Sequence, residues 1–476
     1  MKTVDELMDA GRRAQARVAD YTQEQIDDVC LAIGWQLFNQ ENITRLSELA
    51  VEETGYGNVE SKIAKHHRKV FGVLKDIRGA KTVGLLERDE AKGISKYAKP
   101  MGVVCAILPA TNPTATAGSN ALSILKCRNA VIFRPSSRAE KCSALAIAFM
   151  RRGLAQVGAP EDLIQIMEAP SREATKELMI RSDLVVATGG APMVKAAYSS
   201  GTPSHGVGAG NAVAMVAEDA DVADAIAKVT ASKTFDYATS CSSENSLIVQ
   251  DGVYDEVMSE LRKNKGYICN AEEKETLKNW MWLFNEKKQK YALNPQVVAQ
   301  SALKIAACAG LKVPDDTQML IVEGSQPAVE DKFADEKISP VLAIFRYDEF
   351  KEGVEMLMAI TDRYGRGHSS GIHTFKREYI DYLGETLLTS RITVRQPMAA
   401  ANGGHLYNAM PCTTTLGCGS WGGNATTENV HYKQFLNVTW VNEPITPCEP
   451  TPEEMWGAFW QKFGRPENGD GPKDKE

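Results

Sequence analysis

The sequence predicts an α/β protein made of two lobes, each built on a parallel β-sheet that helices cover. From Gly102 onward, short apolar runs alternate with helix-patterned segments, and the runs are apolar throughout rather than at every second position. Strands of that kind are typical of parallel sheets that are buried on both faces. A chain of 476 residues is also too long for one simple core, which favours two lobes.

The composition is that of a soluble globular protein. A hydrophobic content of 43% and a charged content of 24% exclude disorder over most of the chain. The net charge of -7 offers no basic stripe, so we expect no nucleic-acid partner. The N-terminus lacks the apolar core of a signal peptide and the chain has no long apolar span, which predicts a cytoplasmic protein without membrane contact.

The ten cysteines are scattered without Cys-x-x-Cys pairs. This pattern indicates free thiols in a reducing compartment, and we expect no metal site.

Helices are expected over roughly the first 78 residues, because Ala and Leu recur there at helical spacing. The polar segment 82–97 alternates enough to predict an extended hairpin. Beyond it, strands are predicted at 102–109, 129–135, 162–167, 184–188 and 212–216, with helices at 115–125 and 141–154.

These elements define a nucleotide-binding lobe over residues 1–232, since ligands bind at the carboxyl ends of such strands. A second, catalytic lobe is predicted over 233–425, with a helix at 252–263 and strands at 318–322 and 341–346. A further strand is expected within 426–442. Residues 443–476 are rich in Pro, Glu, Gly and Lys and predict a flexible tail with a short helix at 453–463.

Cys241 is the candidate nucleophile. It lies among small hydroxyl residues, between a helix-patterned run and a short apolar strand-like run. A corner of this kind presents a thiol to a cleft, whereas a cysteine used as a small core residue normally has apolar neighbours. A lone cysteine is more often inert and buried, so the surrounding motifs have to decide.

Two glycine-bearing turns follow predicted strands. One is Thr188-Gly189-Gly190, and the other begins at Gly206 and includes Gly208. Glycine allows backbone to approach a phosphate or a nicotinamide closely, although tight turns without a ligand explain either motif equally well. The first strand-to-helix turn lacks a strict Gly-x-Gly-x-x-Gly fingerprint, which disfavours the ordinary Rossmann mode of binding.

Three polar residues lie in other turns. Asn112 precedes a proline at the end of the first parallel strand, where it is either a turn residue or an amide donor to a developing oxyanion. Glu336 and His368 lie in Gly- or Pro-bearing turns of the second lobe. Taken singly, a solvated glutamate and a structural histidine are the default interpretations.

In combination, and in this order, these motifs resemble the aldehyde dehydrogenase superfamily, and specifically its coenzyme A-acylating branch. The similarity runs from the Glu-Thr-Gly-Tyr-Gly segment at 53–57 to about Asn437. Within that branch, the segment Ala-Thr-Ser-Cys-Ser-Ser-Glu-Asn-Ser at 238–246 most resembles acylating sulfoacetaldehyde dehydrogenases. The resemblance implies a cofactor lobe, a catalytic lobe and an oligomerisation hairpin, here 82–97 meeting a strand near 432–441, and therefore a homodimer or homotetramer.

The resemblance also implies roles for individual residues. Cys241 is the nucleophile, and Asn112 holds the oxyanion together with the Cys241 backbone N–H. His368 is a further catalytic candidate, and Glu336 contacts the nicotinamide ribose. The turns at 188–190 and 206–208 contact the cofactor.

One departure from the family concerns water. Hydrolytic members place a general-base glutamate at the position of Gly206. Without that base, water is a poor second substrate, and a thiol such as coenzyme A takes its place.

A second departure concerns the cofactor. Where the family carries Lys-Pro-Ser-Glu after the second strand, this chain has Arg134-Pro135-Ser136-Ser137-Arg138. The carboxylate that holds the adenine-ribose hydroxyls is absent. Arginines nearby suit a 2′-phosphate, which favours NADP and leaves NAD open.

The expected substrate is a short aldehyde with an anionic tail. Tyr237 and Arg395 replace asparagines of the acylating branch, and the resemblance places both near the aldehyde pocket. A sulfonate tail, as in sulfoacetaldehyde, would suit the forked donors of Arg395. Two alternatives stay open: an acyl-phosphate reductase of the glutamyl phosphate type, and a nucleotide-binding relic without catalytic activity.

Overall fold

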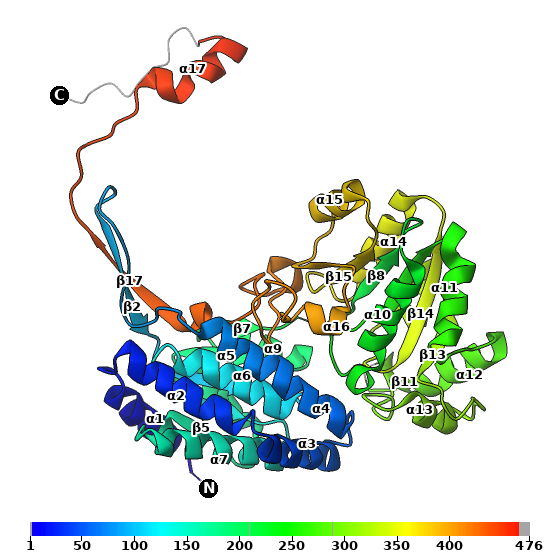
Figure 1. The fold of residues 1–476 in the computed structure, drawn as a ribbon, viewed down its shortest axis with the longest axis horizontal. Helices are drawn as coiled ribbons and strands as arrows, with labels where there is room; N and C mark the ends of the chain where they lie inside the picture. Colours follow the sequence, from blue (N-terminus) through cyan, green and yellow to red (C-terminus); the bar gives the residue numbers. More distant parts are fainter. Residues whose placement is uncertain (1, 209, 288, 466–476) are drawn as a thin grey trace. The chain divides into compact units, whose positions relative to one another are not determined.

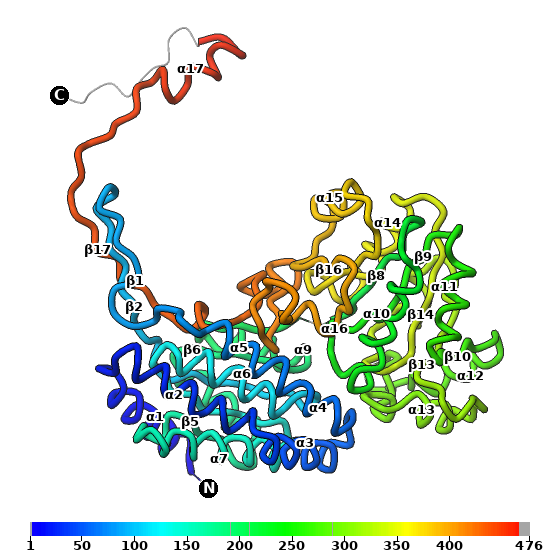
Figure 2. The backbone as a smooth tube through the Cα atoms, viewed as in Figure 1, coloured from blue at the N-terminus to red at the C-terminus, as the bar shows by residue number. Residues whose placement is uncertain are grey.

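A computed structural model describes residues 2–208, 210–287 and 289–465. The chain forms two compact units. The larger unit runs up to Val83 and continues from Lys99 to Asn437, and the smaller comprises Gly84–Ala98 with the chain from Val438 onward. Both predicted lobes lie in the larger unit, whose helices and strands are shown in Figures 1 and 2.

The first lobe is built on a five-stranded parallel sheet with the order β5-β4-β3-β6-β7. Its strands are β3 (Val103–Ile107), β4 (Ala130–Arg134), β5 (Ile164–Ile166), β6 (Leu184–Ala187) and β7 (Ser204–Gly206). The strand order reverses at β3, which pairs with β4 on one side and β6 on the other. A ligand crevice is therefore expected beyond the carboxyl end of β3.

Helices cover this sheet on both faces (Figure 1). They are α1 (Val4–Arg17), α2 (Gln23–Gln36), α3 (Gln40–Thr54), α6 (Pro113–Leu125), α7 (Glu140–Gln156), α8 (Arg172–Arg181) and α9 (Ala191–Tyr198). A further helical run consists of α4 (Val59–Lys65), the π-helical turn η1 (His66–Val70) and α5 (Phe71–Ile77). Short π-helical turns of this kind occur frequently at functional sites.

The second lobe is built on a seven-stranded parallel sheet with the order β10-β13-β14-β9-β8-β15-β16. Its strands are β8 (Val213–Val216), β9 (Ser246–Gln250), β10 (Gly266–Ile268), β13 (Met319–Glu323), β14 (Val341–Tyr347), β15 (Ser370–His373) and β16 (Ile392–Val394). Successive residues of a strand point to opposite faces. Accordingly, Ala214 and Val216 pack with one set of helices, and Val213 and Met215 with the other.

The helices on the first of these faces are α10 (Val222–Thr234) and α11 (Asp251–Lys263). The opposite face carries α12 (Ala271–Met281), α13 (Ala302–Ala309), α14 (Phe350–Arg363) and α15 (Arg377–Thr386). A hairpin of β11 (Trp282–Asn285) and β12 (Lys290–Leu293) follows α12, and α16 (Met398–Ala401) follows β16.

The predicted lobe boundary at residue 232 needs correction. We expected residues 212–216 to join the first sheet, but β8 lies between β9 and β15 in the second. Helix α10 packs on that second sheet as well. The apolar pattern predicts a buried strand but does not specify which of two similar sheets it joins.

The smaller unit contains a hairpin of β1 (Gly84–Asp89) and β2 (Ile94–Pro100), and β2 is also a neighbour of β17 (Leu436–Asn442). Within it, the Lys96 ammonium lies 4.5 Å from the ring centroid of Trp440. Helix α17 (Pro452–Phe463) corresponds to the helix predicted near the C-terminus. The last part of the predicted flexible tail, residues 466–476, lies outside the described residues.

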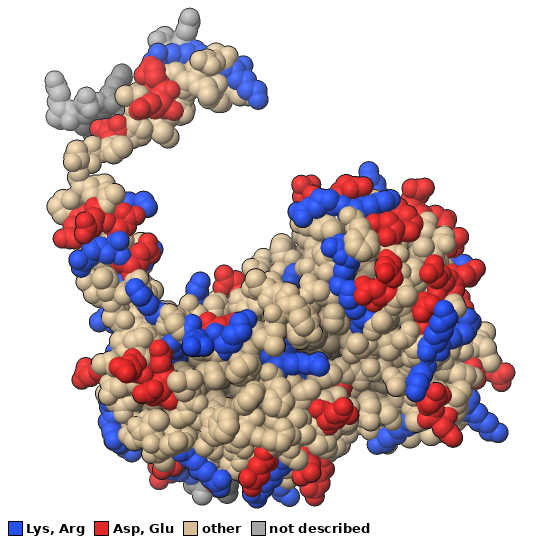
Figure 3. Space-filling model, viewed as in Figure 1, with Lys and Arg blue, Asp and Glu red and all other residues tan. Residues whose placement is uncertain are grey.

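Among the helices that the structure describes, none has the length and apolarity to cross a membrane. On the face shown in Figure 3, acidic and basic side chains are interspersed over most of the surface.

Candidate active site

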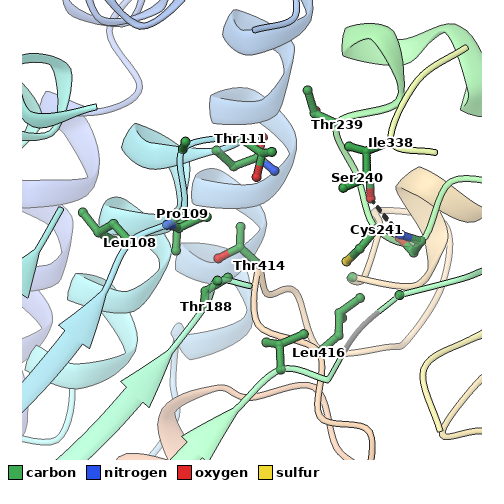
Figure 4. A pocket seen from close by; sticks show the side chains of 18 of the residues that line it. Leu108, Pro109, Thr111, Thr188, Thr239, Ser240, Cys241, Ile338, Thr414 and Leu416 are labelled. Atoms are coloured by element: carbon green, nitrogen blue, oxygen red, sulfur yellow. Dashed lines mark hydrogen bonds between the residues drawn. The ribbon is translucent and has the colours of Figure 1, made fainter. Parts of the chain in front are cut away.

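A cavity of about 460 Å³ opens between the two sheets of the larger unit (Figure 4). The first lobe contributes residues that follow its strands, and the second contributes residues that precede its strands. From the first lobe come Asn112, Arg134, Ser136, Thr188, Gly189, Gly190 and Gly208, and from the second come Gly210, Cys241 and Glu336. The carboxyl edge of one parallel sheet therefore faces the amino edge of the other across the cavity.

Cys241 lines this cavity, and His368 is its closest polar partner. His368 Nε2 lies 3.1 Å from Cys241 Sγ, and Nδ1 lies 2.8 Å from Ser369 Oγ. With the Nδ1 proton donated to Ser369, Nε2 is free to accept the thiol proton. Arg391 fixes the backbone of His368 by donating to its carbonyl oxygen at 2.7 Å.

Burial keeps the Cys241–His368 pair neutral at rest. It raises the pKa of Cys241 to about 12, and the Glu336 carboxylate adds to this effect. Burial also lowers the pKa of His368 to about 3, and the charge of Arg391 acts in the same direction. The resting site is therefore a thiol hydrogen-bonded to a neutral imidazole.

Gly210 allows the backbone before β8 to pass close to the nucleophile. A Cβ at this position would lie 2.5 Å from the Cys241 carbonyl oxygen and 2.9 Å from Glu336 Oε1. No side chain larger than hydrogen fits there. Glu336 therefore lies beside Cys241, where burial raises the pKa of the carboxyl to about 8.

A segment of three residues shortly before Cys241 has an unusual backbone conformation. Asp236, Tyr237 and Ala238 have φ values of 50°, 53° and 57°, in the left-handed region. This conformation costs non-glycine residues about 1–2 kcal/mol each, so strong contacts must hold it. The Asp236 carboxylate accepts from the Asn58 N–H at 2.9 Å. At Gly57 a Cβ would lie only 1.8 Å from Asp236 Oδ1.

Lys65 connects the same aspartate to the predicted oxyanion donor. Its ammonium donates to Asp236 Oδ2, to Asn112 Oδ1 and, at 2.6 Å, to Thr239 Oγ1. Because Asn112 Oδ1 accepts from Lys65, the amide NH₂ of Asn112 is left for another acceptor in the cavity. An oxyanion requires this orientation.

The charges of this cluster are buried. Lys62 also lies 3.3 Å from Asp236 Oδ2. Burial alone would raise the pKa of Asp236, but the two lysines outweigh it and the pKa is lowered. For Lys65, burial lowers the pKa to about 8 against the attraction of Asp236.

The predicted cofactor residues divide into two groups. Thr188, Gly189, Gly190 and Gly208 line the cavity. Arg134 lines it too, and its guanidinium donates to Thr175 Oγ1 at 3.2 Å and to the Pro135 carbonyl at 2.9 Å. Ser137 does not line the cavity, but its neighbour Ser136 does. Arg138 does not line it either, and its guanidinium donates to the Tyr56 hydroxyl at 2.6 Å.

Gly206 does not line the cavity, although Val207 and Gly208 do. A Cβ there would lie 2.6 Å from Val194 Cγ1 and 2.8 Å from Tyr198 Cε2. The Tyr198 hydroxyl accepts from the Gly206 N–H at 2.9 Å. The space that the first side-chain atoms of a glutamate at position 206 would need is therefore filled by α9. A glutamate introduced there would have to displace Tyr198.

The two predicted substrate residues do not line the cavity. The Arg395 guanidinium donates to the Thr374 carbonyl and lies 4.6 Å from the ring centroid of Phe375. Tyr237 is half-buried within the left-handed segment. Sequence reasoning missed Lys65, Lys69 and Asp236, because their partners are distant in the chain.

Among the described residues, no group of three or more His, Cys, Asp or Glu side chains is arranged to hold a metal ion.

The chain is similar to known proteins over most of its length. The model of the aldehyde dehydrogenase family matches residues 1–405. The chain belongs to the aldehyde dehydrogenase family. An acylating sulfoacetaldehyde dehydrogenase from Bilophila wadsworthia is 62% identical to this aldehyde dehydrogenase. The alignment covers 98% of the present chain and 100% of the relative.

Solved structures show the same fold. An acetylating aldehyde dehydrogenase from Geobacillus thermoglucosidasius superposes with a TM-score of 0.88 at 34% identity, covering 94% of this chain and 98% of the other. A propionaldehyde dehydrogenase from Rhodopseudomonas palustris, solved with bound propionyl-CoA, gives a TM-score of 0.82 at 25% identity, covering 93% and 94% of the two chains. The predicted α/β fold with two parallel sheets is confirmed.

Proposed function

We propose that this aldehyde dehydrogenase is coenzyme A-acylating and interconverts sulfoacetaldehyde, CoA and NAD(P)⁺ with sulfoacetyl-CoA and NAD(P)H. The observation that carries the proposal is a nucleophilic Cys241 paired with His368, while the position of a water-activating glutamate is occupied by Gly206 and closed by Tyr198. The similarity to the acylating sulfoacetaldehyde dehydrogenase supports both the reaction and the substrate.

Cys241 and Asn112 on the cavity wall carry out the chemistry together with His368, which is buried next to Cys241. His368 Nε2 takes the thiol proton as Cys241 attacks the aldehyde carbon. The oxyanion then receives hydrogen bonds from the Asn112 amide and the Cys241 backbone N–H. When bound, the nicotinamide accepts the hydride and CoA supplies the thiol that removes the acyl group. Loss of the hydride from the adduct leaves a thioester on Cys241. Transfer of the acyl group to the CoA sulfur frees the Cys241 sulfur, which regains a proton and returns to the resting thiol.

A nicotinamide cofactor fits the first-lobe side of the cavity. The Thr188-Gly189-Gly190 turn after β6 leaves room for a ligand close to the backbone, and Glu336 stands beside Cys241. Arg134 supplies positive charge at the end of β4, which supports use of NADP. On this basis Arg134→Ala should weaken NADPH binding more than NADH binding, and equal losses would argue for NAD.

We also propose a cytoplasmic homo-oligomer assembled through the β1–β2 hairpin and β17. All ten cysteines are free, which suits a reducing compartment. Trp440 on β17 is 57% exposed in the single chain, as expected for a residue that a second copy covers. Sedimentation of wild type and Trp440→Ala tests this role, and an unchanged mass would contradict it.

An assay matrix tests the reaction. Sulfoacetaldehyde, acetaldehyde and propionaldehyde are each incubated with NAD⁺ or NADP⁺, and with CoA, phosphate or neither. Sulfoacetyl-CoA as the main product supports the proposal. A phosphate-dependent acyl phosphate would instead support a reductase of the glutamyl phosphate type, and no reduction of the cofactor under any condition would support an inactive relic.

A further inference from the structure

Lys69 lies on the cavity wall, four residues after Lys65 and within the π-helical turn η1. Its ammonium donates to the carbonyl oxygens of Ala400 and Gly404, each at 3.0 Å. A Cβ at Gly403 would lie 2.7 Å from Lys69 Nζ. The segment after α16 thus holds the Lys69 ammonium in place at the cavity.

The ammonium of Lys69 has an unused donor and an uncompensated charge. A lysine has three N–H donors, and the two carbonyls accept from two of them. Among the residues that the structure describes, no carboxylate forms an ion pair with Lys69. Lys65 differs, since Asp236, Asn112 and Thr239 accept all three of its donors. Lys69 is only partly exposed to water, and an ammonium that is partly shielded without an anionic partner favours binding of an anion there.

A second unused group lies on the same wall. Thr414 lines the cavity (Figure 4), and its hydroxyl oxygen is buried without a hydrogen-bond partner among the described residues. The carbonyl oxygen of the preceding residue, Thr413, is close to the Lys69 ammonium. A Cβ at Gly403 would lie within 2.8 Å of both groups. One ammonium N–H and one hydroxyl therefore remain for a ligand with several acceptor oxygens.

The helical run that carries Lys69 is rich in basic side chains. The helical run α4–η1 carries Lys62, Lys65, Arg68 and Lys69. Of the carboxylates described, only Asp236 forms ion pairs with any of these four side chains. The guanidinium of Arg68 lies 5.1 Å from the ring centroid of Phe235, and Phe235 lines the cavity.

We propose that Lys69 and Thr414 form the subsite for the anionic tail of the aldehyde. The inference deepens the proposed function and rests on it for the reaction, but the anion subsite itself follows from the contacts above. A sulfonate presents three acceptor oxygens one methylene from the carbonyl carbon. Lys69 takes the role that the sequence assigned to Arg395, whose guanidinium binds Thr374 outside the cavity lining.

The first test needs neither CoA nor a nicotinamide. 2-Bromoethanesulfonate alkylates a thiol by displacement of bromide and leaves a sulfonate two carbons from sulfur, the spacing of the sulfoacetaldehyde adduct. 2-Bromoethanol is the neutral control. The ratio of the two alkylation rates at Cys241 is measured by mass spectrometry of the Cys241 peptide.

In the wild type we expect the sulfonate to be favoured, and we expect Lys69→Met to lower the ratio by on the order of tenfold or more. Lys69→Arg, which keeps the charge, should restore part of the preference. Thr414→Val, an isosteric change, should lower the ratio about threefold, in line with loss of one hydrogen bond. Arg395→Met is the matched control and should leave the ratio unchanged.

The second test is kinetic. Lys69→Met should reduce kcat/KM for sulfoacetaldehyde on the order of 100-fold while changing that for acetaldehyde less than about threefold. An unchanged alkylation ratio in Lys69→Met and Thr414→Val, or a loss confined to Arg395→Met, would overturn the subsite. An equal loss on both aldehydes with a raised KM for CoA would also overturn it, because Lys69 would then serve CoA. Failure of the proposed function appears separately, as absence of sulfoacetyl-CoA from the wild type.

Discussion

At the scale of single residues, the site depends on how burial sets the protonation of a few groups. The thiol of Cys241 carries a raised pKa and His368 a lowered one, both primarily through burial. The unligated enzyme therefore holds a protected thiol. In the proposed mechanism Cys241 loses its proton only as it attacks the aldehyde, which limits side reactions of a thiolate with other electrophiles.

The pH dependence of Cys241 reactivity follows from this state. With a thiol pKa of about 12, the thiolate fraction rises with pH throughout the accessible range. Alkylation of Cys241 by neutral iodoacetamide should accelerate roughly tenfold per pH unit between pH 7 and 9. The rate is read from the Cys241 peptide, because Cys308 and Cys448 are exposed and also react. A plateau near pH 8 would show that Cys241 is already a thiolate at rest.

Asn112 provides a prediction for the oxyanion. Replacing it with alanine removes the amide that Lys65 orients, and loss of one oxyanion donor typically costs about 2.7–4 kcal/mol of transition-state stabilisation. We expect kcat for acyl-CoA formation to fall roughly 10²–10³-fold while cofactor affinity is retained. An unaffected kcat would make Asn112 a turn residue only.

At the scale of elements, helix α4 holds in place the loop that carries Cys241, the predicted nucleophile. Lys62 and Lys65 come from α4, and both pair with Asp236 at the start of the left-handed segment. Asn58, at the N-cap of α4, donates its backbone N–H to the same carboxylate. Helix α4 thereby connects Asn112, the predicted oxyanion donor, to the Cys241 loop.

Removing the carboxylate of this clamp should be costly. Asp236→Ala leaves two buried lysines unpaired, and breaking a buried pair in this way costs about 3–5 kcal/mol of unfolding free energy. Asp224→Ala is the control, since its pair with Lys228 is surface-exposed and worth less than about 1 kcal/mol. Urea unfolding measures both. Similar losses for the two variants would contradict a stabilising role for the clamp.

The turn before β8 makes a further prediction. Gly210→Ala places a methyl group against the Cys241 carbonyl and Glu336, so turnover should fall at least 100-fold, in line with the effect of an ångström-scale displacement of reacting groups. Gly384→Ala in α15 meets no neighbouring atom within 4 Å and should keep full activity. Measured kcat/KM values for the two variants decide the matter, and near-normal activity in Gly210→Ala would show that the turn can shift.

At the scale of the whole molecule, the sequence was sufficient to predict the fold class. It was also sufficient to predict those cavity residues that lie at the ends of strands. Asn112, Cys241 and Glu336 were found because each lies in a turn next to a buried strand, and two parallel sheets bring such turns to one cavity. His368 was a candidate because it lies in a Gly-bearing turn of the second lobe. Lys65 was missed because its partner Asp236 is 171 positions away, and no local pattern encodes that contact. The predicted roles of Tyr237 and Arg395 depend on side-chain direction, which strand and helix patterns do not specify.

The central claim is that Cys241 carries an acyl group that CoA, and not water, removes. The most direct measurement is to incubate the enzyme with sulfoacetaldehyde and NADP⁺ without CoA, and to follow the Cys241 peptide by mass spectrometry. The account predicts a persistent sulfoacetyl thioester on Cys241 that disappears when CoA is added, with sulfoacetyl-CoA as the product. Rapid release of free sulfoacetate without CoA, or an acyl group on any other residue, would contradict it.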